Sequence, residues 1–213
     1  MSKLETNPNF KIRIYFEFRA SDFEFSKLDV DLVKTEWSLR IAREDDVPAL
    51  AKLIPLSVRG LQGSHYSSAQ METALETVFG VDRQLIRDGT YFVVEKEGDP
   101  IGCGGWSKRQ TLFGSDHHHT TRDDALLDPS RDAARIRAFF IHPNYARRGV
   151  GRAILDGCEK AIRADGFRKI ELAATLPGET FYAATGYTAG ERSDVSLTNG
   201  EKIGIVQMTK VLS

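Results

Sequence analysis

The sequence feature that most constrains the fold is a joint between an apolar run and a helical pattern, within residues 135–162. Residues 135–141 are mostly apolar or aromatic and are soon followed by Pro143, which predicts a strand that ends near this proline. After Gly149 the apolar residues recur at the spacing of one helix face: Val150, Ile154, Cys158 and Ile162. The chain is therefore predicted to run from a strand through a short loop into a helix.

The loop at this joint contains two glycines and three arginines: Arg147, Arg148, Gly149, Gly151 and Arg152. Glycine lets the backbone come close to a ligand. The first N–H groups of a helix have no partner inside it, and the helix start carries a partial positive charge, so the loop suits a phosphate or pyrophosphate. Neither common nucleotide loop fits, because Ile154 replaces the third glycine of a dinucleotide motif and no Gly-Lys-Ser/Thr ending is present. A purely structural joint with solvated arginines is the alternative.

The loop resembles the acyl-CoA pyrophosphate loop of the GNAT superfamily of N-acetyltransferases, in which Gln/Arg-x-x-Gly-x-Gly/Ala follows a strand. Gly149 and Gly151 match this pattern, and Ala146 stands at its first position. Further along the chain, residues 181–187 resemble the family's Phe-Tyr-x-x-x-Gly-Phe signature, with tyrosine in place of the last phenylalanine. Two motifs in the right order are more specific than either alone, and the resemblance extends from about Leu39 to Leu212.

The resemblance implies a role for each residue of the two motifs. Donor binding falls to the loop residues Arg147, Arg148, Gly149, Val150, Gly151 and Arg152. Main-chain groups of Phe139, Phe140 and Ile141 are expected to position the pantetheine arm and polarise the thioester carbonyl. Tyr182 is the expected general acid, because a phenol with a pKa of ~10 is protonated at neutral pH and can donate to a departing thiolate. The alternative for Tyr182 is a core aromatic residue.

The base that deprotonates the acceptor amine has two candidates. Glu171 lies on the strand predicted after the helix, and His118 lies with His117 and His119 in a long insertion of residues 108–134. Histidine suits this task because its pKa near 6.5 leaves it largely neutral at working pH. Three consecutive side chains do not converge on one ion without an unusual backbone, so no metal is predicted. A solvated loop and a metal-binding protein built on this tract are the alternatives.

Three further residues are candidates for acceptor contacts. Arg135 and Arg137 project to one face of their strand, because side chains alternate along a strand. Two guanidinium groups there suit a carboxylate or phosphate on a small amine, and solvated or ion-paired structural arginines are the alternative. Tyr66 lies in the loop of residues 60–68, between the two helices that wall the acceptor pocket in the resembled family.

The remaining pattern predicts an α/β fold with a single GNAT-like domain over residues 37–213. Strands are predicted at 39–43, 90–95, 101–107, 135–141, 169–174 and 202–212, with helices after residue 44, at 69–78, after Gly149 and around 181–185. Turns are predicted at Gly98-Asp99-Pro100 and Thr198-Asn199-Gly200. The expected architecture is a mixed central sheet of about six to seven strands flanked by about four helices. Residues 1–36 are interpreted as an N-terminal extension, partly disordered or adding a strand.

Composition excludes several classes of function. Lys and Arg number 29 against 30 Asp and Glu, so no basic field suggests nucleic acid as a partner. No apolar run reaches the ~20 residues of a membrane span, and the N-terminus lacks the apolar core of a signal peptide, so no membrane partner is predicted. Two cysteines do not make a disulfide framework, which favours a reduced, cytoplasmic compartment.

These observations predict an acetyl-CoA-dependent N-acetyltransferase that acts by direct attack within a ternary complex, with a small-molecule primary amine as acceptor. Two alternatives stay open, a protein N-terminal or lysine acetyltransferase and a non-catalytic acyl-CoA-binding or regulatory module. Cys103, on a strand with Gly102, Gly104 and Gly105, keeps a covalent route open. Those glycines indicate either a strand that lines the substrate cleft or a strand on which neighbouring side chains leave no room for a Cβ atom. A homodimer is compatible with the sequence.

Overall fold

The computed structural model describes residues 10–11, 33–34, 36–110 and 125–212. Contacts between Cα atoms divide the chain into residues 1–38 and 39–213. In the first unit, β1 (Phe10–Lys11) pairs antiparallel with β2 (Val33–Lys34). The predicted extension of residues 1–36 lies almost entirely outside the described residues, and so do His117, His118 and His119.

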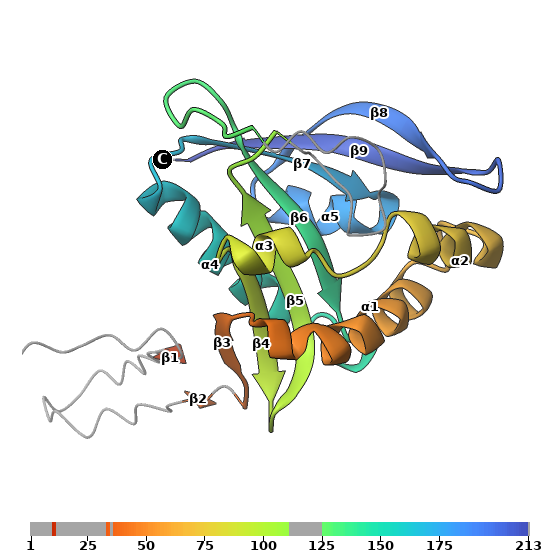
Figure 1. Cartoon of the computed structure of the whole chain (residues 1–213), viewed down its shortest axis with the longest axis horizontal. Helices are drawn as coiled ribbons and strands as arrows, with labels where there is room; N and C mark the ends of the chain where they lie inside the picture. Colours follow the sequence, from red (N-terminus) through yellow and green to blue (C-terminus); the bar gives the residue numbers. More distant parts are fainter. Residues whose placement is uncertain (1–9, 12–32, 35, 111–124, 213) are drawn as a thin grey trace, which may run out of the picture. The chain divides into compact units, whose positions relative to one another are not determined.

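The second unit is built on a seven-stranded mixed sheet in the order β3-β4-β5-β6-β7-β9-β8, which confirms the predicted fold class (Figure 1). Its strands are β3 (Ser38–Ile41), β4 (Tyr91–Lys96), β5 (Asp99–Ser107), β6 (Ala134–Ile141), β7 (Lys169–Thr175), β8 (Thr188–Ser196) and β9 (Lys202–Val211). β6 and β7 are parallel, whereas the pairs β4–β5, β5–β6, β7–β9 and β8–β9 are antiparallel. The parallel pair is the one that a helix must connect.

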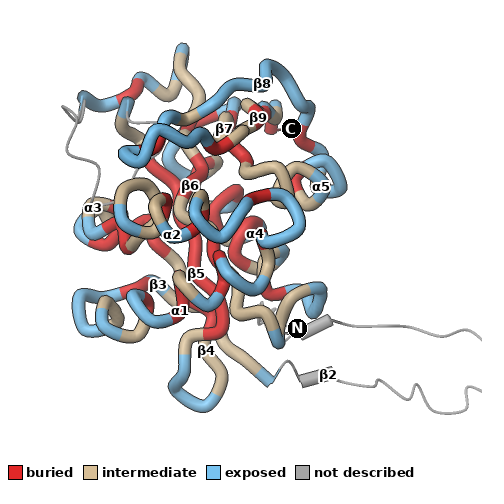
Figure 2. The backbone as a smooth tube through the Cα atoms, turned by 90° about the vertical axis from the view of Figure 1, so that its right-hand side faces the viewer, coloured by how far each residue is buried: buried red, intermediate tan, exposed pale blue. Residues whose placement is uncertain are grey.

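Helices cover both faces of this sheet (Figure 2). The short helix η1 (Glu44–Asp46) leads into α1 (Val47–Leu61), and η2 (Pro143–Tyr145) precedes α4; the other helices are α2 (Ser68–Thr77), α3 (Arg83–Arg87), α4 (Val150–Ala164) and α5 (Leu176–Ala184). The apolar residues of α1, α2 and α3 form one buried cluster with side chains from β4 and β5. The opposite face is covered by α4, whose apolar stripe Val150, Ile154, Cys158 and Ile162 is buried as its spacing predicts.

One helix was not predicted. α3 has only five residues, too few to show a helical period, so the described residues hold five α-helices where about four were expected. Its start is fixed by Asp82, whose Oδ1 accepts hydrogen bonds from Gln84 N and Leu85 N at 3.1 and 3.3 Å. Among the described residues, no helix combines the length and apolar character needed to cross a membrane.

The glycine-rich strand β5 makes room for its neighbours. A Cβ on Gly102 would lie 2.6 Å from Val150 of α4, and a Cβ on Gly104 would lie 2.4 Å from the Phe139 ring. The predicted turn before β5 sits one residue earlier than expected, because Glu97 and Gly98 both have positive φ and Asp99 already belongs to the strand. Such a pair of positive φ angles is the type I′ geometry that suits a two-residue hairpin.

The sheet opens between its parallel strands. β6 pairs with β7 only as far as Ile136 and Leu172, whereas β7 remains paired with β9 up to Thr175. Beyond Ile136 the strand β6 is irregular, since Ala138 has φ +58° and its pairing with β5 shifts register between Cys103 and Gly105. The two strands therefore diverge, and main-chain groups that a continuous sheet would pair face an opening.

Candidate active site

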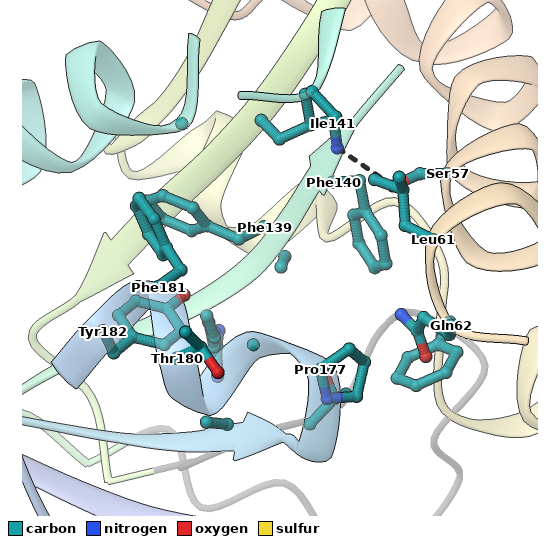
Figure 3. A pocket seen from close by; sticks show the side chains of 18 of the residues that line it. Ser57, Leu61, Gln62, Phe139, Phe140, Ile141, Pro177, Thr180, Phe181 and Tyr182 are labelled. Carbon is teal, nitrogen blue, oxygen red and sulfur yellow. Dashed lines mark hydrogen bonds between the residues drawn. The ribbon is translucent and has the colours of Figure 1, made fainter. Parts of the chain in front are cut away.

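A cavity of about 630 Å³ occupies the opening between β6 and β7 (Figure 3). Its walls come from six segments of the chain: residues 136–141 of β6, 173–175 of β7, 146–152 at the start of α4, 177–182 of α5, 78–80 after α2, and the end of α1 with the loop after it. This volume lies in the range of small-molecule sites. The two segments that carry the sequence motifs therefore border the same cavity.

The start of α4 forms the cationic end of this cavity. Gly149 is the N-cap with φ +88°, a conformation that favours glycine, and its carbonyl accepts a hydrogen bond from Ala153 N at 3.0 Å. Arg147, Gly149, Gly151 and Arg152 line the cavity. The first amides of α4 have no partner within the helix, so this end can hold an anion. Among the residues that the structure describes, no group of three His, Cys, Asp or Glu side chains is arranged to hold a metal ion.

Two residues of the predicted donor loop do not line the cavity with their side chains. The Arg148 guanidinium lies 5.7 Å from the centre of the Tyr145 ring, and the Val150 side chain is buried against Gly102. Val150 still contributes an amide to the first turn of α4. The positive side chains that face the cavity at this end are thus Arg147 and Arg152.

Tyr182 of α5 lies in an aromatic wall of the cavity (Figure 3). Its ring meets those of Phe139, Phe181 and Tyr187 edge to face, at centroid distances of 6.1, 5.0 and 5.5 Å. Burial raises the pKa of the Tyr182 phenol well above its ordinary value, so it stays protonated at neutral pH. Within the described part of the chain, no hydrogen bond of its hydroxyl is found.

The backbone of β6 directs alternate amides to opposite edges. His142 N donates to Ile101 O of β5 at 2.9 Å, whereas Ile141 N donates to Ser57 Oγ of α1 at 2.9 Å. Because amide directions alternate along a strand, the Phe139 N–H points to the same edge as that of Ile141, toward the opening. The Ile141 amide is already engaged by Ser57.

Comparison with known proteins identifies this arrangement. A model described as "Acetyltransferase (GNAT) family" matches residues 59–187, which is more than half of the chain. The chain belongs to the GNAT acetyltransferase family. The predicted family is therefore confirmed, and the match includes both motifs. No curated protein matched the chain.

Solved structures share the GNAT fold. A GCN5-related N-acetyltransferase from Rhodopseudomonas palustris is 26% identical, with a TM-score of 0.61 over 82% of this chain and 95% of that one. A PaiA N-acetyltransferase from Thermoplasma acidophilum in complex with coenzyme A is 14% identical, with a TM-score of 0.55 over 82% and 98%. A ribosomal-protein-alanine N-acetyltransferase from Brucella melitensis is 17% identical, with a TM-score of 0.54 over 82% and 99%. The last two likenesses are to the fold alone.

The two arginines predicted to hold an acid group of the acceptor are each paired with a carboxylate in this GNAT domain. Arg137 lines the cavity, but its guanidinium lies 2.9 Å from Asp82, and both side chains are almost fully buried. Arg135 pairs with Glu171 across the parallel register and does not line the cavity. The structure therefore favours the ion-paired alternative for both arginines, and Glu171 lies outside the cavity in which a base is needed.

Tyr66, the predicted substrate contact, lies beneath the cavity rather than in its lining. Its buried hydroxyl donates to Gly204 O at 2.7 Å and accepts from Leu176 N at 2.8 Å. Since Leu176 is the first residue of α5 and the N-cap Thr175 makes no side-chain cap, Tyr66 caps the helix that carries Tyr182. Burial raises the pKa of the Tyr66 phenol, so it remains a neutral donor and acceptor.

The cavity is also lined by His65, from the loop of residues 60–68 that was predicted to contact the substrate, and by three polar residues that were not predicted individually: Ser57, Gln62 and Ser64. Gln62 and His65 fall in or next to the loop between the first two helices, which was the only signal available. Cys103 lies outside the lining; burial raises the pKa of its thiol to about 12, so it is a thiol and a poor nucleophile at neutral pH.

Proposed function

We propose that this protein transfers an acetyl group from acetyl-CoA to the primary amine of a small molecule, by direct attack within a ternary complex. The observation that carries the proposal is that one cavity joins a helix start suited to an anion, an opened strand edge and a buried tyrosine. Binding, carbonyl polarisation and proton donation are the functions that acetyl transfer requires.

Donor binding is assigned to the amides that begin α4 and to the side chains of Arg147 and Arg152. A pyrophosphate accepts hydrogen bonds from such amides and gains from the partial positive charge of the helix start. The opened edges of β6 and β7 offer main-chain donors and acceptors to the amides of a pantetheine arm. The Phe139 amide is the group that stabilises negative charge on the thioester oxygen.

The chemical step makes one C–N bond and breaks one C–S bond. The neutral amine of the acceptor attacks the thioester carbon, and the C–S bond breaks as Tyr182 donates its proton to the departing thiolate. The nitrogen gives up one proton as the amide forms, and that proton returns through water to the Tyr182 phenolate. Its raised pKa keeps the phenol protonated until that charge develops. A covalent route through cysteine is disfavoured, because Cys103 is a buried thiol outside the cavity.

His65 is our candidate for the group that takes the proton of the acceptor ammonium. Among the described residues that line the cavity, His65 is the one whose neutral side chain offers a ring nitrogen that can accept a proton. His65 Nδ1 lies 2.8 Å from Ser64 Oγ. When Nδ1–H donates to this hydroxyl, Nε2 is free to accept a proton. Glu171 is not assigned, because it pairs with Arg135 outside the cavity.

The test compares wild type and Tyr182→Phe in two assays. Acetyl-CoA at a hundred times its Kd should stabilise both proteins by ~2.7 kcal/mol, which raises Tm by roughly 5–11 °C. In a CoA-release assay with a panel of amines, Tyr182→Phe should lower kcat by about 10²–10⁴-fold. A binding module would show the thermal shift with no turnover in either protein. Turnover with peptide amines only would favour a protein acetyltransferase.

A further inference from the structure

The side-chain oxygen of Gln62 lies at the cavity without a hydrogen-bond partner among the residues that the structure describes. Gln62 ends α1, where its N–H donates to Val58 O at 3.1 Å and its carbonyl accepts from the amides of His65 and Tyr66 at 3.0 and 3.1 Å. The residue is 8% exposed and lines the cavity, yet its Oε1 has no hydrogen bond within the described part of the chain. Figure 3 shows its amide end directed toward Pro177.

This isolation sets Gln62 apart from other glutamines of the domain. Gln70 Nε2 donates to Lys202 O at 2.6 Å, and Gln84 Nε2 donates to Asp88 Oδ1 at 2.9 Å. A buried amide oxygen without a partner is unfavourable for stability, so such a group is expected where a ligand completes its hydrogen bonding. The oxygen of the amide can accept up to two hydrogen bonds, and its nitrogen can donate two.

The charges around this amide restrict the ligand. Among the described residues that line the cavity there is no carboxylate. Three arginines line it: Arg147, Arg137, which is paired with Asp82, and Arg152, which is paired with Asp156 at 2.7 Å. A second positive charge on an acceptor would be desolvated here without a counter-charge, which is unfavourable. A negative group would find Arg137 already paired with Asp82, and the other two arginines lie at the donor end.

Aromatic side chains complete this end of the cavity. Phe79 and Phe140 both line it and meet edge to face at 6.0 Å, beside Leu61 and Val78. This surface suits an apolar body rather than a polar chain. Gln62 is then the polar group that fixes the orientation of that body.

From this arrangement we infer that Gln62 binds a neutral polar group of the acceptor, and that the acceptor is a monoamine with an apolar body and such a group. The inference rests on the proposed acetyl transfer and names its acceptor class. The amide of Gln62 forms paired hydrogen bonds with a carboxamide or a hydroxyl, while Phe79 and Phe140 contact the apolar body. This acceptor class replaces the predicted acceptor with an acid group. Arg135 and Arg137, which were expected to bind that acid group, are paired with carboxylates of the protein.

The test uses three amines and two matched variants in the CoA-release assay. Leucinamide has the proposed features, 3-methylbutylamine lacks only the carboxamide, and lysinamide adds a second positive charge. Gln62→Leu removes the cavity amide, and Gln84→Leu makes the same change on α3, outside the cavity. Acetyl-CoA binding, followed by Tm, is measured for every protein.

Wild type should use leucinamide with a kcat/KM about tenfold or more above those of the other two amines. Gln62→Leu should lower kcat/KM about tenfold for leucinamide and leave kcat/KM for 3-methylbutylamine unchanged. Its Tm should be unchanged or higher, and acetyl-CoA should raise that Tm as much as in the wild type. Gln84→Leu should retain the wild-type preference. Loss of leucinamide turnover together with a lowered Tm would indicate a structural role and overturn the assignment.

Other outcomes are equally decisive. Unchanged leucinamide kinetics in Gln62→Leu, or lysinamide used as well as leucinamide, would refute the acceptor class. Stabilisation by acetyl-CoA with no turnover of either monoamine would refute it too and leave the donor site standing. Absence of any stabilisation by acetyl-CoA would instead refute the proposed function on which the inference rests.

Discussion

Tyr66→Phe tests whether the residue beneath the cavity holds α5 in place. The substitution keeps the ring and removes one hydroxyl, which donates to Gly204 O at 2.7 Å and accepts from Leu176 N at 2.8 Å. Each bond contributes about 0.5–1.5 kcal/mol, and a main-chain group left without a partner adds to that loss. The expected loss of stability is therefore about 2 kcal/mol, which lowers Tm by about 4–8 °C in a domain of this size.

Tyr182→Phe is the matched control for this prediction. Both tyrosines are buried, at 5% and 7% exposure, but no hydrogen bond of the Tyr182 hydroxyl is found among the described residues. Differential scanning calorimetry of the two variants should thus show a lowered Tm for Tyr66→Phe alone, whereas the CoA-release assay should show the larger loss of kcat for Tyr182→Phe. Equal Tm changes in the two variants, or none in Tyr66→Phe, would refute the capping role of Tyr66.

Three further predictions concern the donor loop, the central strands and acid stability. Gly149→Ala should cost about 1–2 kcal/mol in urea unfolding, because φ is +88° although no atom lies within 4 Å of the new Cβ, and it should weaken acetyl-CoA binding in the thermal-shift assay. Gly104→Ala should cost about 1–3 kcal/mol and lower kcat, because its Cβ would lie 2.4 Å from the Phe139 ring and displace it; calorimetry and CoA release check this. The hydrogen bonds from Arg109 hold the pKa of Asp88 below its ordinary value. As pH falls below about 4, the unfolded chain therefore binds more protons than the folded protein, and the free energy of unfolding decreases. Asp88→Asn should flatten this part of the curve of unfolding free energy against pH.

The local patterns of the sequence were enough for the central part of the fold. The apolar run of residues 135–141, the two glycines and the apolar stripe of α4 each depend on neighbours within a few turns, and the structure places them as strand, loop and helix. The two hairpins and the mixed sheet followed in the same way from alternation and turn residues. α3 escaped this reasoning because five residues are too few to show a period.

The sequence alone therefore determined the family, the order of the elements apart from α3, and the loop at the start of α4. Tertiary structure decided which side chains reach the cavity and which are paired elsewhere. Alternation predicts a common face for Arg135 and Arg137, but the carboxylates they meet, Glu171 and Asp82, are supplied by β7 and by the start of α3. The sequence shows Gln62 only as a polar residue at the end of a helix. The structure shows that its Oε1 is buried at the cavity with no hydrogen-bond partner among the described residues. Burial and ion pairing depend on contacts between residues that are far apart in the chain, and a short-range sequence pattern does not contain such contacts.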